Sequence, residues 1–238
     1  MSTPKRFFIE KIEEEVALTG DEFRHAKSVL RLSEGDEVTL LDGSGKEYSA
    51  IVSKVEKSRL ILHVVSVQTA DTEPMSEICL LIGYLKGDKT ELVVQKATEL
   101  GTSRILVFSS KYSSAYMNDN KLERLKRVAH EAAKQCRRAA SPSVEYYDTL
   151  KGALEAAQNY ESKLFACEFL TDNGASMSEV KTPCALVVGS EGGFAEEEFE
   201  LAQSLGYKGV SLGKRILRAE TAAIAMVSVA AHALGELG

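Results

Sequence analysis

The stretch Val187-Val188-Gly189-Ser190-Glu191-Gly192-Gly193-Phe194 carries the clearest structural signal in the chain. Its apolar start predicts a buried strand, its glycines predict a tight loop, and the pattern over 195–205 predicts a helix. Glycine lets the backbone adopt a positive φ and approach a ligand closely, and the first turn of a helix offers free N–H groups. We therefore expect a strand–loop–helix unit that can cradle a phosphate or a nucleoside, although a plain strand-to-helix turn has the same pattern.

This glycine loop does not match the common nucleotide-binding fingerprints. It fits neither G-x-x-x-x-G-K-[ST] nor G-x-G-x-x-G, which excludes the motifs that bind nucleoside triphosphates and dinucleotides in most proteins.

A second polar segment follows this unit. It reads Leu212-Gly213-Lys214-Arg215-Ile216-Leu217-Arg218-Ala219-Glu220-Thr221-Ala222-Ala223 and lies between a predicted strand over 210–212 and a predicted helix over 218–234. Ligands bind in open α/β sheets at the carboxyl ends of parallel strands, which is where this segment places its polar side chains. A capped helix with an incidental salt bridge is the alternative interpretation.

From residue 77 onward, predicted strands and helices alternate, which favours an α/β fold with a largely parallel sheet. Asp88 and Glu91 are the expected cap of the first of these helices. The predicted strands cover 78–84, 105–108, 164–167, 185–188 and 210–212, and the predicted helices cover 88–100, 122–139, 195–205 and 218–234.

The first 70 residues predict a small β-barrel instead. Thr19 and Glu22 have the spacing of a capping box in front of one short helix. Residues 71–76 are polar and contain Pro74, which is typical of a linker. The expected strands cover 6–9, 37–41, 48–55 and 60–67, and Asp42-Gly43-Ser44-Gly45 is the expected hairpin turn between two of them.

Charge is distributed unevenly along the chain. The 238 residues are 44% hydrophobic, as in an ordinary globular protein, and their net charge of −6 argues against nucleic-acid binding. Residues 86–140, however, carry twelve basic and six acidic side chains, whereas residues 141–238 carry seven basic and fourteen acidic. Residues 121–127 with Lys134, Arg137 and Arg138 are predicted to lie on a single basic helix. We interpret this helix as a phosphate-contacting surface, with a solvated helix face as the alternative. The acidic half need not touch phosphate.

The spacing of the cysteines and the length of the apolar segments indicate in which cellular compartment to expect the protein. Cys79, Cys136, Cys167 and Cys184 have no C-x-x-C or zinc-ligand spacing, so we expect free buried thiols and no metal site. The N-terminus shows no apolar leader, and the apolar run over 222–234 is too short and too polar to span a membrane. We therefore expect a soluble protein of the reducing cytoplasm.

The two polar segments, at this separation, resemble the RsmE family of 16S ribosomal RNA uridine methyltransferases, within the SPOUT superfamily. One difference is visible: the family usually has Gly-Pro-Glu-Gly-Gly where this chain has Gly189-Ser190-Glu191-Gly192-Gly193. Ser190 removes the φ constraint of proline and restores an N–H. Further matches cover nearly the whole chain: Arg6-Phe7-Phe8, His25-Ala-Lys-Ser-Val29-Leu30-Arg31, Lys96-Ala-Thr-Glu99-Leu100-Gly101, and Glu131-Ala-Ala-Lys-Gln135-Cys-Arg137 followed by Pro142.

The resemblance implies a domain plan and an activity. Residues 1–70 would form a PUA-like barrel for RNA docking, 71–76 a linker, and 77–238 a SPOUT-type α/β methyltransferase domain with a deep trefoil knot. The protein would be a homodimer with the active site at the subunit interface. It would use S-adenosyl-L-methionine to methylate N3 of a specific uridine in the 16S rRNA of the small ribosomal subunit. Neither a membrane nor a metal is expected as a partner.

The resemblance also assigns binding residues. The residues expected to bind S-adenosylmethionine come from three strand ends: Leu164, Phe165, Ala166, Leu170, Val188, Gly189, Ser190, Glu191, Gly192, Gly193, Leu212, Gly213, Ile216, Leu217, Arg218, Thr221 and Ala222. The residues expected to contact RNA are Arg6, Arg24, His25, Lys27, Arg31, Gln135, Arg137 and Arg138.

Three residues are catalytic candidates. Methyl transfer from a sulfonium is an in-line displacement, so catalysis consists mostly of positioning. The uridine N3–H is a weak acid, so a base must remove the proton or a cation must stabilise the developing uracil anion. Arg218 suits the second task. Glu191 or Glu220 suits the first, and either carboxylate is equally suited to orienting Arg218.

Two other functions compete with this one. A non-catalytic RNA-binding or ribosome-assembly factor would keep the fold, and Ser190 is the one feature in its favour. A small-molecule nucleotide enzyme of doubly wound topology would lack a reason for the barrel and the basic helix.

Overall fold

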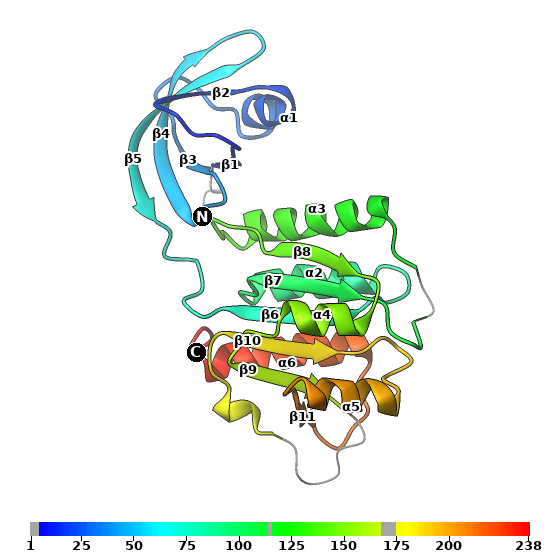
Figure 1. Cartoon of the computed structure of the whole chain (residues 1–238). Helices are drawn as coiled ribbons and strands as arrows, with labels where there is room; N and C mark the ends of the chain where they lie inside the picture. The colour runs from blue at the N-terminus through cyan, green and yellow to red at the C-terminus, as the bar shows by residue number, and fades with distance from the viewer. Residues whose placement is uncertain (1–4, 114–115, 168–174) are drawn as a thin grey trace. The chain divides into compact units, whose positions relative to one another are not determined.

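The computed structural model describes residues 5–113, 116–167 and 175–238. They divide into two compact units (Figure 1). The first contains the chain up to Glu73 together with Lys134–Ala140, and the second contains Pro74–Ala133 and Ser141–Gly238. The first unit is therefore discontinuous in sequence.

The first unit is a five-stranded sheet with one short helical segment. The order of its strands is β1-β3-β4-β5-β2, with β1 parallel to β3 and the other neighbours antiparallel. Gly43 and Gly45 have positive φ in the β3–β4 hairpin, as the sequence predicts. The elements are β1 (Arg6–Phe8), β2 (Glu15–Leu18), α1 (Gly20–Arg24), the π-helical η1 (His25–Val29), β3 (Glu37–Leu41), β4 (Lys46–Val55) and β5 (Leu60–Thr69).

Strand β2 is not predicted from the sequence, and the predicted capping box at Thr19 and Glu22 is wrong. The Thr19 side chain makes no capping hydrogen bond, and the Glu22 carboxylate instead lies 3.1 Å from the Lys134 ammonium. Lys134, from a distant part of the chain, thus occupies the carboxylate that a capping box would need.

The second unit is a six-stranded sheet in which every neighbouring pair is parallel, as predicted. The strand order is β11-β9-β10-β6-β7-β8. The strands are β6 (Ile78–Gly83), β7 (Arg104–Phe108), β8 (Ser143–Tyr147), β9 (Ser162–Ala166), β10 (Cys184–Val188) and β11 (Lys208–Val210). The helices are α2 (Lys89–Glu99), α3 (Asp119–Gln135), α4 (Leu150–Ala156), the 3-10 turn η2 (Met177–Glu179), α5 (Glu196–Ser204) and α6 (Ala219–Ala233).

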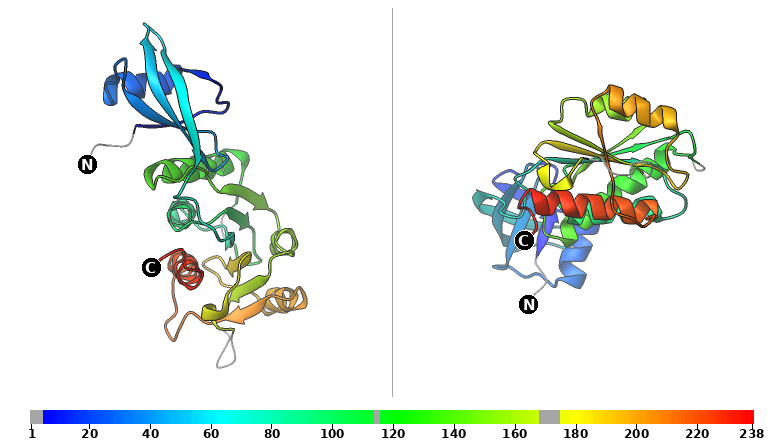
Figure 2. Two further views of the ribbon diagram at one scale, coloured as in Figure 1. Left: turned by 90° about the vertical axis from the view of Figure 1, so that its left-hand side faces the viewer. Right: turned by 90° about the horizontal axis from the view of Figure 1, so that it is seen from below.

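Helices cover both faces of this sheet (Figure 2). Ile78, Leu80 and Ile82 pack with α2, α3 and α6, whereas Cys79 and Leu81 pack with α4 and α5. This period of two is the alternation that a strand imposes on its side chains. Because both faces of the sheet are covered, β6 is apolar along its whole length.

The basic helix ends earlier than the sequence predicts. Helix α3 ends at Gln135, and Arg137 has φ = 67°, a left-handed conformation that no helix continues through. Arg137 and Arg138 therefore lie beyond the helix. Two further differences concern other elements. Asp88, the predicted cap of α2, makes no capping hydrogen bond. Strand β8 and helix α4 are also not predicted from the sequence.

Candidate functional site: a cleft at the carboxyl edge of the parallel sheet

A cavity of about 890 Å³ lies where β9, β10 and β11 end. Ligands of open α/β sheets bind beyond the carboxyl ends of the strands, near the point where the strand order reverses. Here the chain runs from β6 to β8 on one side of the sheet and returns to β9 on the other. The lining residues are Lys89, Ala166, Cys167, the loop from Val188 to Phe194, the segment from Val210 to Ala219, and Ala222.

The glycine loop that follows β10 is packed so closely that its glycines cannot be replaced freely. A Cβ on Gly192 would lie 2.5 Å from the Cβ of Tyr112, and a Cβ on Gly83 would lie 2.4 Å from the backbone N of Ser190. Gly193 has φ = 68°, and its N–H donates to the Ser190 carbonyl over 3.0 Å. The Ser190 side chain is buried, with its hydroxyl 3.1 Å from that of Ser110. This hydrogen bond joins the loop to the end of β7.

Lys89, a lining residue, connects two carboxylates, of which Glu191 lines the cavity and Glu220 does not. Its ammonium lies 3.1 Å from the Glu191 carboxylate and 3.8 Å from Glu220 Oε2. Burial alone would raise the pKa of Glu191, but hydrogen bonds from its own N–H and that of Lys86, together with Lys89, hold the pKa below its ordinary value. Within residues 5–113, 116–167 and 175–238, the buried Glu220 Oε2 accepts no hydrogen bond.

Arg218 is the N-cap residue of α6, and its side chain is exposed at the cavity. Its carbonyl accepts the first helical hydrogen bond, from Ala222 over 2.8 Å. Among the described residues, no carboxylate pairs with its guanidinium. The backbone of Arg218 is therefore fixed by the helix, while its charge is available to a ligand.

Most of the predicted cofactor residues line the cavity, but not all do. Leu164 and Phe165 are buried in β9, and the Phe165 ring packs 4.1 Å from that of Phe194 behind the loop. Thr221 lies on α6 outside the lining, and Leu170 lies outside the described residues. The predicted residues in the lining are Ala166, Val188, Gly189, Ser190, Glu191, Gly192, Gly193, Leu212, Gly213, Ile216, Leu217, Arg218 and Ala222.

Several lining residues were missed. Lys214, Arg215 and Ala219 lie inside the segment that the sequence singles out, so their position was the available signal. Lys89 has no such signal, because Glu191 is 102 residues away in sequence. The remaining missed residues are Cys167, Phe194, Val210 and Ser211.

The cavity suits an adenosine-containing ligand. Its volume is in the usual range for small-molecule sites. Ala166, Val188, Leu212 and Leu217 provide apolar surface, and the loops at 189–193 and 211–213 expose backbone groups for hydrogen bonds. The side chains therefore fit S-adenosylmethionine, the cofactor that the sequence resemblance implies. In the described part of the chain, no cluster of His, Cys, Asp and Glu could hold a metal ion.

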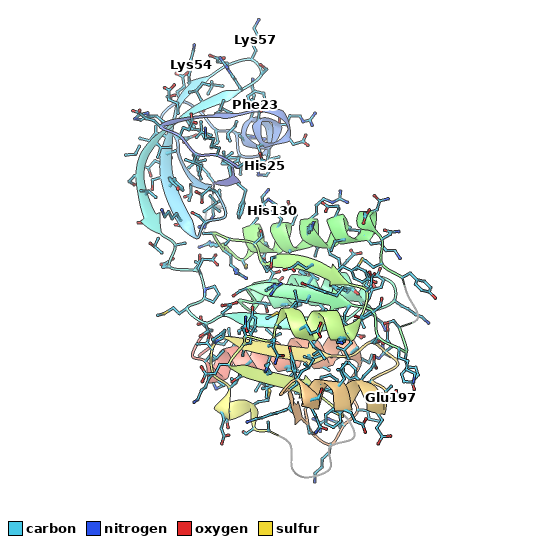
Figure 3. The ribbon with its side chains drawn as sticks, viewed as in Figure 1. Phe23, His25, Lys54, Lys57, His130 and Glu197 are labelled. Carbon is cyan, nitrogen blue, oxygen red and sulfur yellow. The ribbon has the colours of Figure 1, made fainter. Side chains whose placement is uncertain are left out.

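The first unit carries most of the predicted RNA-contacting residues. Arg24, His25, Lys27 and Arg31 are exposed on and beside α1 and η1. Figure 3 labels His25 and Phe23 there; the ammonium of Lys27 lies 5.3 Å from the centre of the Phe23 ring. The side chains thus form one local group on a short helical segment.

Residues 134–140 add to the same unit. The Arg137 carbonyl accepts hydrogen bonds from Thr72 over 2.8 Å and from Arg6 over 3.1 Å. The side chains of Gln135 and Arg137 are exposed. The turn at Arg137 is therefore fixed by its backbone, which leaves the side chain available.

Two predicted RNA contacts occupy structural positions instead. The Arg6 side chain is 12% exposed and lies 2.5 Å from Glu47, and the Arg138 side chain is 6% exposed and lies 3.1 Å from Glu73. Glu73 also accepts hydrogen bonds from the N–H groups of Ala139 and Ala140. A guanidinium buried against a carboxylate satisfies that carboxylate and is not available to phosphate.

Two families of known proteins match successive parts of the chain. The RNA methyltransferase domain family matches residues 71–231, and the RNA methyltransferase PUA domain family matches residues 18–65. The ribosomal RNA small subunit methyltransferase E of Synechocystis is 33% identical over 89% of this chain and 71% of its own length. That of Mesomycoplasma hyopneumoniae is 30% identical over 94% of this chain and 97% of its own length.

A solved structure agrees with these matches. The ribosomal RNA small subunit methyltransferase E of Neisseria gonorrhoeae, bound to S-adenosyl methionine, superimposes with a TM-score of 0.84 at 26% identity, over 96% of this chain and 97% of that one. The predicted fold class, a PUA-like domain followed by a parallel-sheet methyltransferase domain, is confirmed. The chain belongs to the ribosomal RNA small subunit methyltransferase E family of RNA methyltransferases.

Proposed function

We propose that this protein uses S-adenosylmethionine to methylate N3 of a specific uridine in the 16S rRNA of the small ribosomal subunit. The observation that carries the proposal is the cleft, in which a tightly packed glycine loop and apolar walls adjoin the exposed cation of Arg218, which has no carboxylate partner among the described residues. In this proposal the cleft would supply both parts that the reaction needs, a cofactor site and a group that can act on the base.

Cofactor binding would use the loop at 188–193 and the segment at 211–217. When bound, S-adenosylmethionine supplies a methyl group on a sulfonium. The chain itself contributes position and exclusion of water: Ala166 and Leu217 give apolar surface, and the glycine loop allows close approach of the backbone.

Arg218 would stabilise the uracil as it loses its N3 proton. A guanidinium donates hydrogen bonds in a fixed planar geometry, so it can bind a uracil carbonyl oxygen as negative charge develops there. The helix holds the Arg218 backbone in place before the substrate arrives.

Glu191 and Glu220 are suited to different tasks. Glu191 accepts hydrogen bonds from Lys86 and Lys89 and has a lowered pKa. It is therefore a weak base near neutral pH, and we assign it to holding Lys89. Glu220 does not line the cavity; its buried Oε2 lies 3.8 Å from the Lys89 ammonium and accepts no hydrogen bond from the described residues. Glu191 is thus the less suitable base of the two, and we keep Glu220 as the candidate for any general-base role.

The remaining assignments follow from the family resemblance. We propose residues 1–70 as the RNA-docking domain, 71–76 as a linker and 77–238 as the methyltransferase domain, with the trefoil knot and the homodimer that the resemblance implies. The exposed residues Arg24, His25, Lys27, Arg31, Gln135 and Arg137 would contact RNA. In the described part of the chain, no helix could span a membrane. A ribosomal substrate favours the cytoplasm.

The decisive experiment supplies labelled S-adenosylmethionine and small ribosomal subunits that lack the modification, followed by nucleoside mass spectrometry. We expect 3-methyluridine at one position. Cofactor binding by calorimetry without any 3-methyluridine would contradict the proposal and favour a non-catalytic assembly factor. Light scattering would test the dimer.

A further inference from the structure

The cations around the cleft exceed what the cofactor can use. Among the described residues, Lys89, Lys214, Arg215 and Arg218 line the cavity together with a single carboxylate, that of Glu191. Lys89 is engaged by Glu191 and Glu220. The other three cations lie within five residues, and none has a carboxylate partner among residues 5–113, 116–167 and 175–238.

The cofactor does not explain this concentration of positive charge. S-adenosylmethionine carries a sulfonium, an ammonium and one carboxylate, so it is a net cation near neutral pH. One cation suffices for its carboxylate, and further cations repel it. Arg218 has a role at the reacting base, which leaves Lys214 and Arg215 without an assigned function.

Lys214 and Arg215 are both exposed, and the next residue, Ile216, is 89% exposed. Gly213, just before them, has φ = 107°, a conformation that favours glycine. The chain thus presents two basic side chains at the mouth of the cavity without covering them.

The surrounding sequence is acidic, which makes this pair a local exception. Residues 141–238 carry twice as many acidic as basic side chains. The acids at the start of α5 are partly occupied: Glu197, labelled in Figure 3, pairs with Lys111 over 3.0 Å, and Glu198 accepts the N–H of Lys111. A small cationic site in an acidic region can bind phosphate at one point without attracting RNA generally.

We propose that Lys214 and Arg215 form a phosphate-binding site at the mouth of the cleft, which holds the RNA backbone next to the target uridine. Arginine can bind a phosphate with two parallel hydrogen bonds, and lysine adds a point charge. Phosphate contacts set the position of a nucleic acid without reading its bases. The site rests on the proposed function for its substrate and extends RNA contact to the acidic half of the chain.

The test compares the double variant Lys214→Ala/Arg215→Ala with wild type and with Lys208→Ala. Lys208 is an exposed lysine on β11 that does not line the cavity, so it controls for loss of charge. Binding to unmodified small subunits is measured at several KCl concentrations, and the cofactor Kd is measured by calorimetry.

Two lost phosphate contacts predict a salt slope, in log K against log [KCl], that is shallower by about 1.5. We expect KM for subunits to rise about tenfold with kcat nearly unchanged, while the cofactor Kd stays within about twofold and Lys208→Ala behaves as wild type. Lys214→Arg/Arg215→Lys keeps the charges and should restore the slope.

Other results would overturn the inference. A salt slope of the double variant equal to that of wild type would rule out the phosphate-binding site. A weakened cofactor Kd with normal subunit binding would assign the pair to the cofactor carboxylate, the other anion within reach. If wild type forms no 3-methyluridine, the proposed function fails, yet the binding slopes still decide whether these two residues hold RNA.

Discussion

Both edges of the parallel sheet carry polar and ionisable groups, but the two edges differ in how far these groups are paired with one another. At the amino edge, the Arg104 guanidinium binds both oxygens of Glu145 over 2.7 and 2.9 Å and the carbonyl of Ala156. The Tyr160 hydroxyl donates to Glu77 over 2.6 Å. Burial raises the pKa of the Cys79 thiol to about 12. This edge is a closed network around neutral thiols.

The carboxyl edge leaves charges open. Arg218, Lys214 and Arg215 surround a cavity and have no carboxylate partner in the described structure, and Glu220 Oε2 lacks a hydrogen bond there. An unpaired polar atom costs free energy when it is buried, which here applies to Glu220 Oε2. The three cations are exposed and hydrated, so their lack of carboxylate partners costs little and leaves them available to a ligand. The open edge therefore favours binding, whereas the paired network at the other edge favours stability.

The largest expected effect comes from Arg218→Ala. If this cation stabilises the developing uracil anion as we propose, its loss should lower kcat by about 10²–10³-fold. The cofactor Kd should stay within a few-fold, because the helix cap is a backbone feature. The measurement is single-turnover methylation of small subunits with calorimetry in parallel. Arg218→Lys keeps the charge but loses the planar arrangement of donors, so its kcat should fall between those of wild type and Arg218→Ala. Full activity in Arg218→Ala would rule out this assignment.

A second prediction concerns the shape of the cleft. Gly192→Ala would bring a Cβ to 2.5 Å from the Cβ of Tyr112, so the glycine loop or the segment carrying Tyr112 must move. We expect cofactor affinity to fall by about tenfold or more, measured by calorimetry. Tyr112→Gly in the same protein removes the opposing Cβ and should recover part of the affinity. Normal binding by Gly192→Ala alone would show that the close packing of the loop has no role.

The sequence predicts the cleft well where its signals are local. The loop from Gly189 to Gly193 and the segment from Leu212 to Ala223 each combine a strand end, a glycine and a helix start, so their chemistry is visible within a dozen residues. The parallel sheet follows in the same way from alternating elements.

The sequence fails where a role depends on a distant partner. Arg6 and Arg138 resemble RNA-binding residues until the fold brings Glu47 and Glu73 beside them. Lys89 looks like an ordinary helix residue until Glu191 reaches it. Charge alone does not distinguish an engaged side chain from an available one, because the pairing partner is set by topology.

A smaller effect is expected at Ser190. Its hydroxyl shares a hydrogen bond with that of Ser110 over 3.1 Å, and a neutral hydrogen bond contributes about 0.5–1.5 kcal/mol. Ser190→Ala should weaken cofactor binding about threefold. Ser110→Ala removes the same hydrogen bond and also the one between the hydroxyls of Ser110 and Ser113. The double variant should therefore be no weaker than Ser110→Ala alone, because Ser190→Ala removes only the shared interaction. Additive losses would mean that the two serines act separately.

The smallest effect on turnover is expected at the amino edge. Glu145→Gln keeps the shape of the side chain and removes its charge. Because Glu145 lies on β8, at the opposite end of the strand order from β9 and β11, kcat and the cofactor Kd should match wild type. A change in either would weaken the contrast between the two edges of the sheet.

Glu145→Gln should instead lower the free energy of unfolding. The pH dependence of this loss follows from the direction of the pKa shift of Glu145. The hydrogen bond with Arg104 holds the pKa of Glu145 below its ordinary value of 4.5. A carboxyl whose pKa is lower in the folded state stabilises the fold above its unfolded pKa, and that stabilisation is lost as pH falls. Urea midpoints for wild type should therefore exceed those of Glu145→Gln by a constant margin from pH 6 to 8. The margin should shrink as pH falls below about 4.5. A margin that does not depend on pH would show that the charge of Glu145 contributes nothing, and that shape and hydrogen bonding alone hold this edge together.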